Sequence, residues 1–198
     1  MSILLPQPRL PQKAVPRLID AGAVQQGGPG GTAQRLNRLG TRFALDIAYP
    51  RLRPEPDGRV LAARVRRAVN DGALFPFPQP GFNIGTPGAP VVDGGGQAGS
   101  TLRVRGFAAA YPYREGQFFS VIIGGQRYLY QASADGVADG AGKANVPVFP
   151  MLRIPPADGA ICEFAQPYIE GYITAGAAEI ELTIAKSMIP QITITERA

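Results

Sequence analysis

The chain of 198 residues is 45% hydrophobic, enough to build the core of one domain, and it carries a formal net charge of +5. It has no histidine, which excludes Ser-His-Asp and Cys-His nucleophile systems and most zinc and iron sites. Its 25 glycines and 20 prolines disfavour long helices, and every apolar run is shorter than the roughly 18 residues of a membrane span. The N-terminus lacks the basic segment of a signal peptide, so we expect none.

Residues 1–40 are predicted to form an extended arm rich in proline and glycine. Five prolines and a Gly-Gly-Pro-Gly-Gly run fall within residues 1–31, which argues against a regular helix or a central strand. Residues 3–19 alone hold seven large aliphatic residues, too many for a fully solvated tail. We therefore expect the arm to become ordered by lying on another subunit.

Charge is distributed unevenly along the chain. Residues 1–67 hold 12 Lys and Arg against 4 Asp and Glu, whereas residues 68–198 hold 8 against 11. A basic segment can bind nucleic acid or an acidic protein surface, including another copy of the same chain. Phe43 and Tyr49 are the only aromatic residues among the first 67, so a stacking platform for single strands is missing. We favour protein contact and disfavour nucleic acid.

The middle of the chain predicts a strand, a helix and an extended segment. Residues 41–52 alternate apolar and polar side chains, as in a strand with one buried face, and Pro50 suggests that the strand ends there or lies at a sheet edge. Residues 59–70 place Leu61, Val65, Ala68 and Val69 on one helical face. We expect Asp57 to cap this helix and Asn70-Asp71-Gly72 to end it. Three prolines make residues 74–80 an extended edge or an anchoring loop.

From residue 89 onward the pattern is one of short strands and turns. Gly124-Gly125 separates two apolar runs and predicts a hairpin with a primed turn. Strand spacings of about 10 to 12 residues are typical of a sandwich or barrel. The fold class predicted is therefore mainly β, an antiparallel β-sandwich or barrel-like domain over residues 41–198 with one short α-helix. The predicted strands cover residues 101–107, 117–123, 127–131, 145–149, 160–164, 168–173, 179–185 and 191–195.

Two glycine-rich stretches mimic ligand-binding motifs. Gly94, Gly96 and Gly99 fit G-x-G-x-x-G, but a dinucleotide site needs a helix after the glycines, and residues 101–107 read as a strand. We interpret the glycines as a mobile loop or a tight turn with positive φ. Asp135 and Asp139 lie in a turn that lacks the ligand series of an EF-hand. No cofactor-binding or metal-ligating residue is assigned.

The candidates for catalysis are few. Six aspartates stand in Asp-Gly pairs, where a carboxylate is more often a turn former than a catalyst. A carboxylate hydrolase could use Glu115, Glu163 or Glu170, but nothing in the sequence pairs them. We expect Cys162 to be a buried small hydrophobe, and one cysteine excludes an internal disulfide. No catalytic residue is assigned, and an enzyme is not expected.

A carbohydrate-binding β-sandwich is the alternative to a purely structural protein. Sugar platforms use exposed aromatic side chains, and Tyr111 and Tyr113 could supply them. Tyr128 and Tyr130 share one face of a predicted strand, which favours a core or interface position for them.

Three degenerate motifs occur in a fixed order within residues 43–153. They are GQAGSTL at residues 96–102, EGQFFSV at 115–121 and DGAGKANVPVFPMLR at 139–153. Together with the strand RFALDIAYPRL, the helix RVLAARVRRAV and an F-P-x-P segment, this order resembles the distal tail proteins of long-tailed bacteriophages. The long arm and the lack of length for a second, galectin-like domain depart from that group, so a neighbouring minor tail protein stays an alternative.

The resemblance implies a structural role in the virion. Proteins of that group form a ring, commonly a hexamer, where the tail tube meets the baseplate. It implies that the partners are further copies of this chain, the tail tube protein and baseplate hub proteins, with no membrane partner. It also implies a location at the tail tip, assembled in the host cytoplasm, with no catalytic residue and no cofactor.

Overall fold

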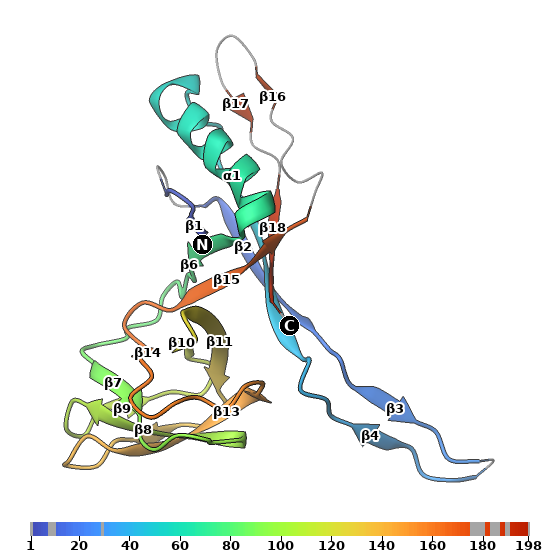
Figure 1. Cartoon of the computed structure of the whole chain (residues 1–198), viewed down its shortest axis with the longest axis vertical. Coiled ribbons are helices and arrows are strands. Elements are labelled where there is room, and N and C mark those ends of the chain that lie inside the picture. The colour runs from blue at the N-terminus through green and yellow to red at the C-terminus, as the bar shows by residue number, and fades with distance from the viewer. Residues whose placement is uncertain are drawn as a thin grey trace.

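A computed structural model describes residues 2–7, 11–28, 30–174, 181–182, 187–188 and 191–197. It contains two six-stranded sheets and one α-helix (Figure 1). The first, which we call the open sheet, has the order β1 (Ile3–Leu4), β6 (Ala73–Pro76), β15 (Tyr168–Ile173), β18 (Ile192–Glu196), β5 (Arg42–Ala48) and β2 (Lys13–Ile19). The second, the barrel, has the order β14 (Cys162–Glu163), β10 (Phe118–Ile123), β11 (Gln126–Ala132), β13 (Ala144–Leu152), β8 (Gly99–Phe107) and β7 (Gly88–Val92). The mainly-β prediction is confirmed.

The barrel is almost closed, because its two outer strands meet. Val91 of β7 forms an antiparallel bridge with Ile161 next to β14, and the Val92 N–H donates to the Ala160 carbonyl at 2.9 Å. Aromatic side chains fill the interior: Phe119 and Phe164 stack with ring centroids 4.2 Å apart. Closure removes the exposed edges that an open sheet of this size would present.

The predicted hairpin in the barrel is confirmed. β10 and β11 pair from Phe118–Gln131 to Ile123–Gln126, which leaves Gly124 and Gly125 as the turn. Both have positive φ, 59° and 81°, as a type I′ turn requires.

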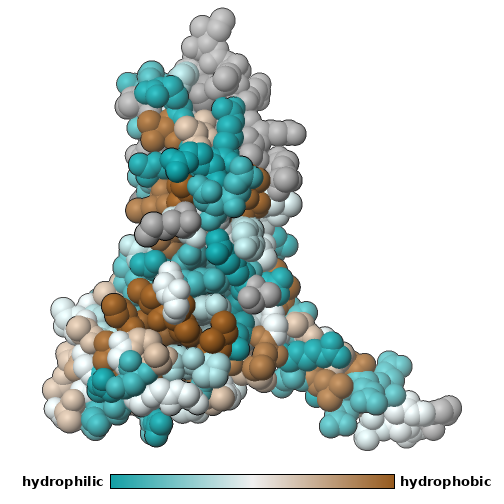
Figure 2. All heavy atoms as spheres, viewed as in Figure 1, coloured by the Kyte–Doolittle hydropathy of each residue, from teal (hydrophilic) through white to brown (hydrophobic). Residues whose placement is uncertain are grey.

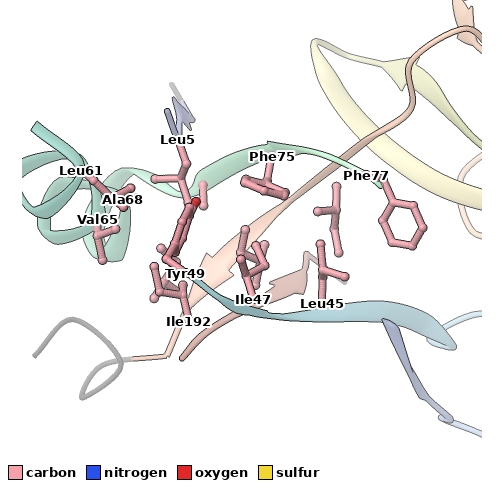
Figure 3. Close-up of a cluster of buried hydrophobic side chains, with 14 of the residues drawn as sticks. Leu5, Leu45, Ile47, Tyr49, Leu61, Val65, Ala68, Phe75, Phe77 and Ile192 are labelled. Carbon is pink, nitrogen blue, oxygen red and sulfur yellow. The ribbon is translucent and has the colours of Figure 1, made fainter. Parts of the chain in front are cut away.

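The core of the open sheet lies under the helix. Leu61, Val65 and Ala68 of α1 (Arg59–Asp71) are fully buried and lie beside Leu5, Tyr49 and Ile192 in the core of the open sheet (Figure 3). The predicted helix and its apolar face are therefore confirmed.

The ends of the helix were predicted with mixed success. The predicted cap by Asp57 is wrong: Gly58 occupies the N-cap position without a side-chain hydrogen bond, after a π-helical turn (η1, Pro54–Gly58). Gly72, at φ 92°, ends the helix as predicted.

The structure does not show residues 1–40 as a separate extended arm, and this corrects the prediction. β1 pairs in parallel with β6, and β2 pairs antiparallel with β5 along its whole length. Leu5, between them, is 1% exposed. Pro16 is tolerated because β2 is an outer strand, where a missing N–H need not break a ladder.

Residues 74–80 were predicted to form an extended edge or an anchoring loop. β6 lies inside the open sheet between β1 and β15, so the part of residues 74–80 that is a strand is not at an edge. The predicted strand 179–185 lies mostly outside the described residues, apart from β16 (Glu181–Leu182), which pairs with β17 (Ser187–Met188). β9 (Pro112–Tyr113) and β12 (Gly136–Val137) form a small extra pair.

Among the described helices, none is long and apolar enough to span a membrane.

Candidate interaction surface

A two-stranded hairpin leaves the body of the protein. Beyond Ile19 and Arg42, the ladder of β2 and β5 continues into β3 (Ala23–Gln25) and β4 (Gln34–Leu36), which extend away from both α1 and the barrel (Figure 1). We call residues 20–39 the projecting hairpin. Its Val24, Leu36 and Leu39 are 60%, 39% and 54% exposed. An isolated two-stranded ribbon is marginally stable in water, so this hairpin depends on its continuity with β2 and β5.

The root of the projecting hairpin is held by one aspartate. The Asp20 carboxylate accepts the Gly22 N–H and the Thr41 hydroxyl and pairs with Arg35. The Gly22 N–H, together with Arg35 and Thr41, lowers the pKa of Asp20 below its usual value. Arg38, further along, is exposed and forms no ion pair within the described part of the chain.

An apolar groove of about 640 Å³ runs beside β2. One wall is the edge of the open sheet, where Ala14 and Pro16 lie opposite Ile47 and Leu45 and so share their core-facing side. The other residues that line the groove are Pro11, Gln12, Lys13, Phe77, Pro78, Gln79, Pro80, Phe82, Glu115, Gly116 and Phe118.

The far wall of the groove is fixed to the barrel by a glutamine. The Gln79 amide accepts the Phe118 N–H at 2.7 Å and donates to the Phe118 carbonyl at 3.3 Å, taking the place of a neighbouring strand. Phe77 and Phe118 lie with ring centroids 4.4 Å apart. The proline-rich segment 77–82 is therefore a preformed wall.

Two carboxylates lie at the rim of the groove. Glu115 lines it, and the Glu115 N–H donates to the Asp135 carboxylate at 2.7 Å. Both side chains lack an ion pair among the residues that the structure describes. The groove thus carries the Glu115 carboxylate with Asp135 beside it, together with the ammonium group of Lys13, and Arg38 of the projecting hairpin is a basic residue.

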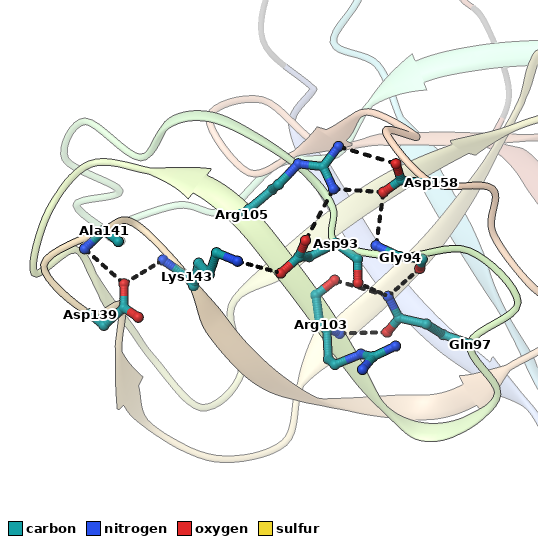
Figure 4. A network of polar contacts seen from close by, with 9 residues as sticks. All are labelled: Asp93, Gly94, Gln97, Arg103, Arg105, Asp139, Ala141, Lys143 and Asp158. Atoms are coloured by element: carbon teal, nitrogen blue, oxygen red, sulfur yellow. Dashed lines mark hydrogen bonds and ion pairs between the residues drawn. The ribbon is translucent and has the colours of Figure 1, made fainter.

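The first motif, at residues 96–102, holds a glycine loop against β8. The Gln97 amide donates to the carbonyls of Asp93, Gly94 and Arg103 and accepts the Arg103 N–H at 2.6 Å (Figure 4). Gly94 and Gly96 have positive φ, and a strand follows, so these glycines form a tight turn as predicted.

An ion network ties the same loop to the rest of the barrel. Arg105 contacts Asp93 at 3.1 Å and Asp158 at 2.6 Å, and Lys143 contacts Asp93 at 3.2 Å (Figure 4). The Asp158 carboxylate also accepts the Gly94 N–H. The hydrogen bond from Arg105, followed by that from Gly94, lowers the pKa of Asp158 to about 2.

The third motif begins with a turn former. The Asp139 carboxylate accepts the N–H groups of Ala141 and Lys143 at 2.9 and 2.7 Å. Gly142 has φ 72°, and a Cβ there would meet the Phe107 carbonyl. Among the described residues, no group of three potential ligands gathers around Asp135 or Asp139.

Hydrogen bonds with residues of the second and third motifs position two buried tyrosines. Gln117 donates to the Tyr111 hydroxyl at 3.0 Å, and that hydroxyl donates to the Ile84 carbonyl at 2.9 Å. Tyr113 donates to the Asn145 carbonyl at 3.1 Å. Tyr111 and Tyr113 are 5% and 6% exposed, so they do not form an open platform for a sugar.

The two other tyrosines, Tyr128 and Tyr130, are buried as predicted from their shared strand face.

A buried polar seam joins the open sheet to the barrel. Glu196 of β18 accepts the N–H of Phe43 in β5 and of Leu129 in β11, and pairs with Arg153 at 2.7 Å. Glu170 of β15 accepts the Arg127 N–H at 2.9 Å. Burial raises the pKa of Glu196, although Arg153 opposes this. Glu196 was not singled out from the sequence, where it is recognisable only as an acidic residue at the end of a strand with alternating apolar residues.

The structure places the proposed hydrolase carboxylates in different surroundings. Glu163 pairs with the Arg127 guanidinium at 3.0 Å and accepts the Ser120 hydroxyl, while Glu170 accepts the Ser2 hydroxyl. Glu115 lies apart at the groove. Two of the three are thus engaged in contacts that hold strands together.

Cys162 is buried in β14, as predicted. Burial raises the pKa of its thiol to about 12.

The distinctive surface features are therefore the projecting hairpin and the groove beside β2. A scan against protein-family models finds no match to this chain, and a search of curated proteins finds none either.

Proposed function

We propose that this chain is a structural subunit of the tail tip of a long-tailed bacteriophage, where copies of it form a ring between the tail tube and the baseplate. The tail tube protein and baseplate hub proteins are its other proposed partners. The proposal starts from the three ordered sequence motifs and their resemblance to distal tail proteins.

The projecting hairpin is the observation that carries the proposal. It exposes apolar and basic side chains on a ribbon that has no core of its own. A protein that functions alone gains nothing from such a segment, whereas a subunit of an assembly covers it with a neighbour.

The roles of the motif residues also support a structural protein. Gln97, Gln117 and Asp139 accept backbone N–H groups in turns and loops, and Arg153 neutralises a buried carboxylate. These contacts fix the shape of the barrel.

The test removes the projecting hairpin and leaves the body intact. Replacing residues 21–40 by Asn-Gly, which joins Asp20 to Thr41 in the existing register, should close β2 onto β5, keep the thermal unfolding temperature within a few degrees and abolish self-association in light scattering. Deleting residues 1–31 is unsuitable as a test because it also removes β1 and β2.

The location is tested separately by electron microscopy of virions that carry a labelled copy of this chain. Label in a ring at the tail tip is expected. Virions that lack the label, or that carry it in the head, would contradict the proposal.

A further inference from the structure

We propose that the groove beside β2 receives the projecting hairpin of a second copy of this chain. This inference rests on the proposed self-assembly and names the two surfaces that meet. The contact is head-to-tail, so each copy offers its hairpin to one neighbour and its groove to another.

The hairpin cannot fill the groove of its own chain. It leaves β2 and β5 at the Ile19 end, whereas the groove lies along residues 11–16 of the same edge. With β2 and β5 paired, the ribbon runs away from the barrel that forms the far wall (Figure 1). A projecting hairpin that occupies this groove must therefore come from another molecule.

The groove does not suit an added β-strand. Pro16 lacks an N–H, and Lys13 places a charge on this outer strand, whereas Arg17 pairs with Asp46 of β5; proline and lysine on an outer strand are usual devices against edge-to-edge pairing. An occupant must instead bring side chains to the apolar floor and walls. A short, two-sided ribbon fits that requirement.

The apolar surfaces match in kind. The hairpin offers Val24, Leu36 and Leu39, all exposed. The groove offers Pro16 of β2 and Phe82 of the proline-rich wall. Figure 2 shows hydrophobic residues on the projecting ribbon among hydrophilic ones, which is the pattern of a contact surface.

The charges match in sign. Arg38 of the hairpin has no ion pair among the described residues, and the same holds for Glu115 and Asp135 at the groove rim. Docking would place Arg38 near Glu115 and its neighbour Asp135 and away from Lys13, the like charge that also lines the groove. Such rim charges select the partner and the orientation more than they add affinity.

The decisive experiment mixes two variants that are each unable to assemble. Leu36→Asp places a charge on the apolar surface of the hairpin and leaves the groove intact. Phe82→Asp places a charge in the groove and leaves the hairpin intact. Each variant alone should be monomeric in analytical ultracentrifugation. Mixed at equal concentrations they should form a 1:1 dimer and nothing larger, because only one productive contact remains.

A charge exchange tests the rim. Arg38→Glu should weaken self-association by roughly three- to tenfold, and Glu115→Arg in the same chain should restore it. Arg66→Glu on the exposed face of α1 is the matched control, and it should change neither the association nor the fold.

A disulfide cross-link tests the same contact without the aspartate variants, whose loss of assembly could also come from loss of folding. A chain with Leu36→Cys and Pro16→Cys should form disulfide-linked multimers on mild oxidation, while either single variant should not form the ladder.

The outcomes separate this inference from the proposed function. Assembly that resists all these variants, or a chain that neither associates nor cross-links at high concentration, overturns the hairpin-in-groove contact. In the first case the ring proposal survives with another interface. Labelling at the tail tip decides the ring proposal independently.

Discussion

At the scale of single residues, glutamine and aspartate side chains form hydrogen bonds with backbone groups that have no backbone partner. The Gln79 amide hydrogen-bonds to both the N–H and the carbonyl of Phe118. The Gln97 amide donates to the Gly94 carbonyl in the glycine loop and accepts the Arg103 N–H of β8. An unpaired buried backbone group costs about 1–3 kcal/mol, so each of these amides secures a loop that regular structure does not. Their neighbours in sequence, mostly glycine and proline, cannot do so.

Cys162 gives a prediction at this scale. Because burial raises the pKa of its thiol to about 12, the thiolate population near pH 8 is very small in the folded protein. Alkylation by iodoacetamide at pH 8 should be many-fold slower than in urea-unfolded protein, as followed by mass spectrometry. Equal rates in the two states would show that the thiol is accessible.

The same shift has a defined sign for stability. The thiol has a pKa near 9 in the unfolded chain and about 12 in the folded protein. Its contribution to the free energy of unfolding is therefore fully present below pH 9 and is lost as the pH rises from about 9 to 12.

At the scale of elements, the glycine loop 93–99 is held to β8 and to the loop before β14 by charge as well as by Gln97. Arg105 links Asp93 and Asp158, and Asp158 also accepts the Gly94 N–H. These groups are largely solvent-exposed, so the ties orient the loop more than they stabilise the whole protein.

Acid should release this loop before the protein unfolds. The pKa of Asp158 is lowered from 3.8 to about 2, so its contribution is present above pH 4 and is lost as pH falls from about 4 to 2. Hydrogen exchange of the Gly94 amide, corrected for intrinsic rates, should show falling protection across that range. Asp158→Asn should show low protection already at neutral pH, and unchanged protection in that variant would refute the role.

At the scale of the whole molecule, two hydrophobic cores are joined through the polar seam. Glu196 bridges β5 and β11 while Arg153 supplies the counter-charge, and their side chains are 1% and 3% exposed. Leu129 of β11 belongs to the core of the open sheet. We therefore expect the two cores to unfold together.

The seam gives a prediction for stability. Removing one member of a buried ion pair leaves the other without compensation, so Arg153→Met or Glu196→Gln should each lower the free energy of unfolding by about 3–5 kcal/mol. The double variant should lose less than the sum, because no bare charge remains. Urea denaturation, monitored by circular dichroism, measures all three variants, and additive losses would mean that the pair is not coupled.

The interaction surface was only partly accessible to sequence reasoning. The N-terminal segment was predicted to become ordered on another subunit, but β1 and β2 pair within their own chain, and a contact role for the projecting hairpin is a proposal. The groove could not be predicted, since Ala14, Phe77, Phe82 and Phe118 come together only when β2 packs beside the barrel. Likewise, no local pattern links Glu196 to Leu129, 67 residues away.

By itself the sequence determined the elements whose signals are local. The apolar spacing of residues 59–70 specifies α1, Gly124-Gly125 specifies the β10–β11 turn, and alternation specifies β5 and β8. Only the tertiary structure decided that residues 13–19 pair with β5, that β6 lies inside the open sheet and that the barrel closes. Strand pairing joins residues that are distant in the chain, and an edge position can accommodate prolines that would break a central strand, so no short window of sequence contains that information.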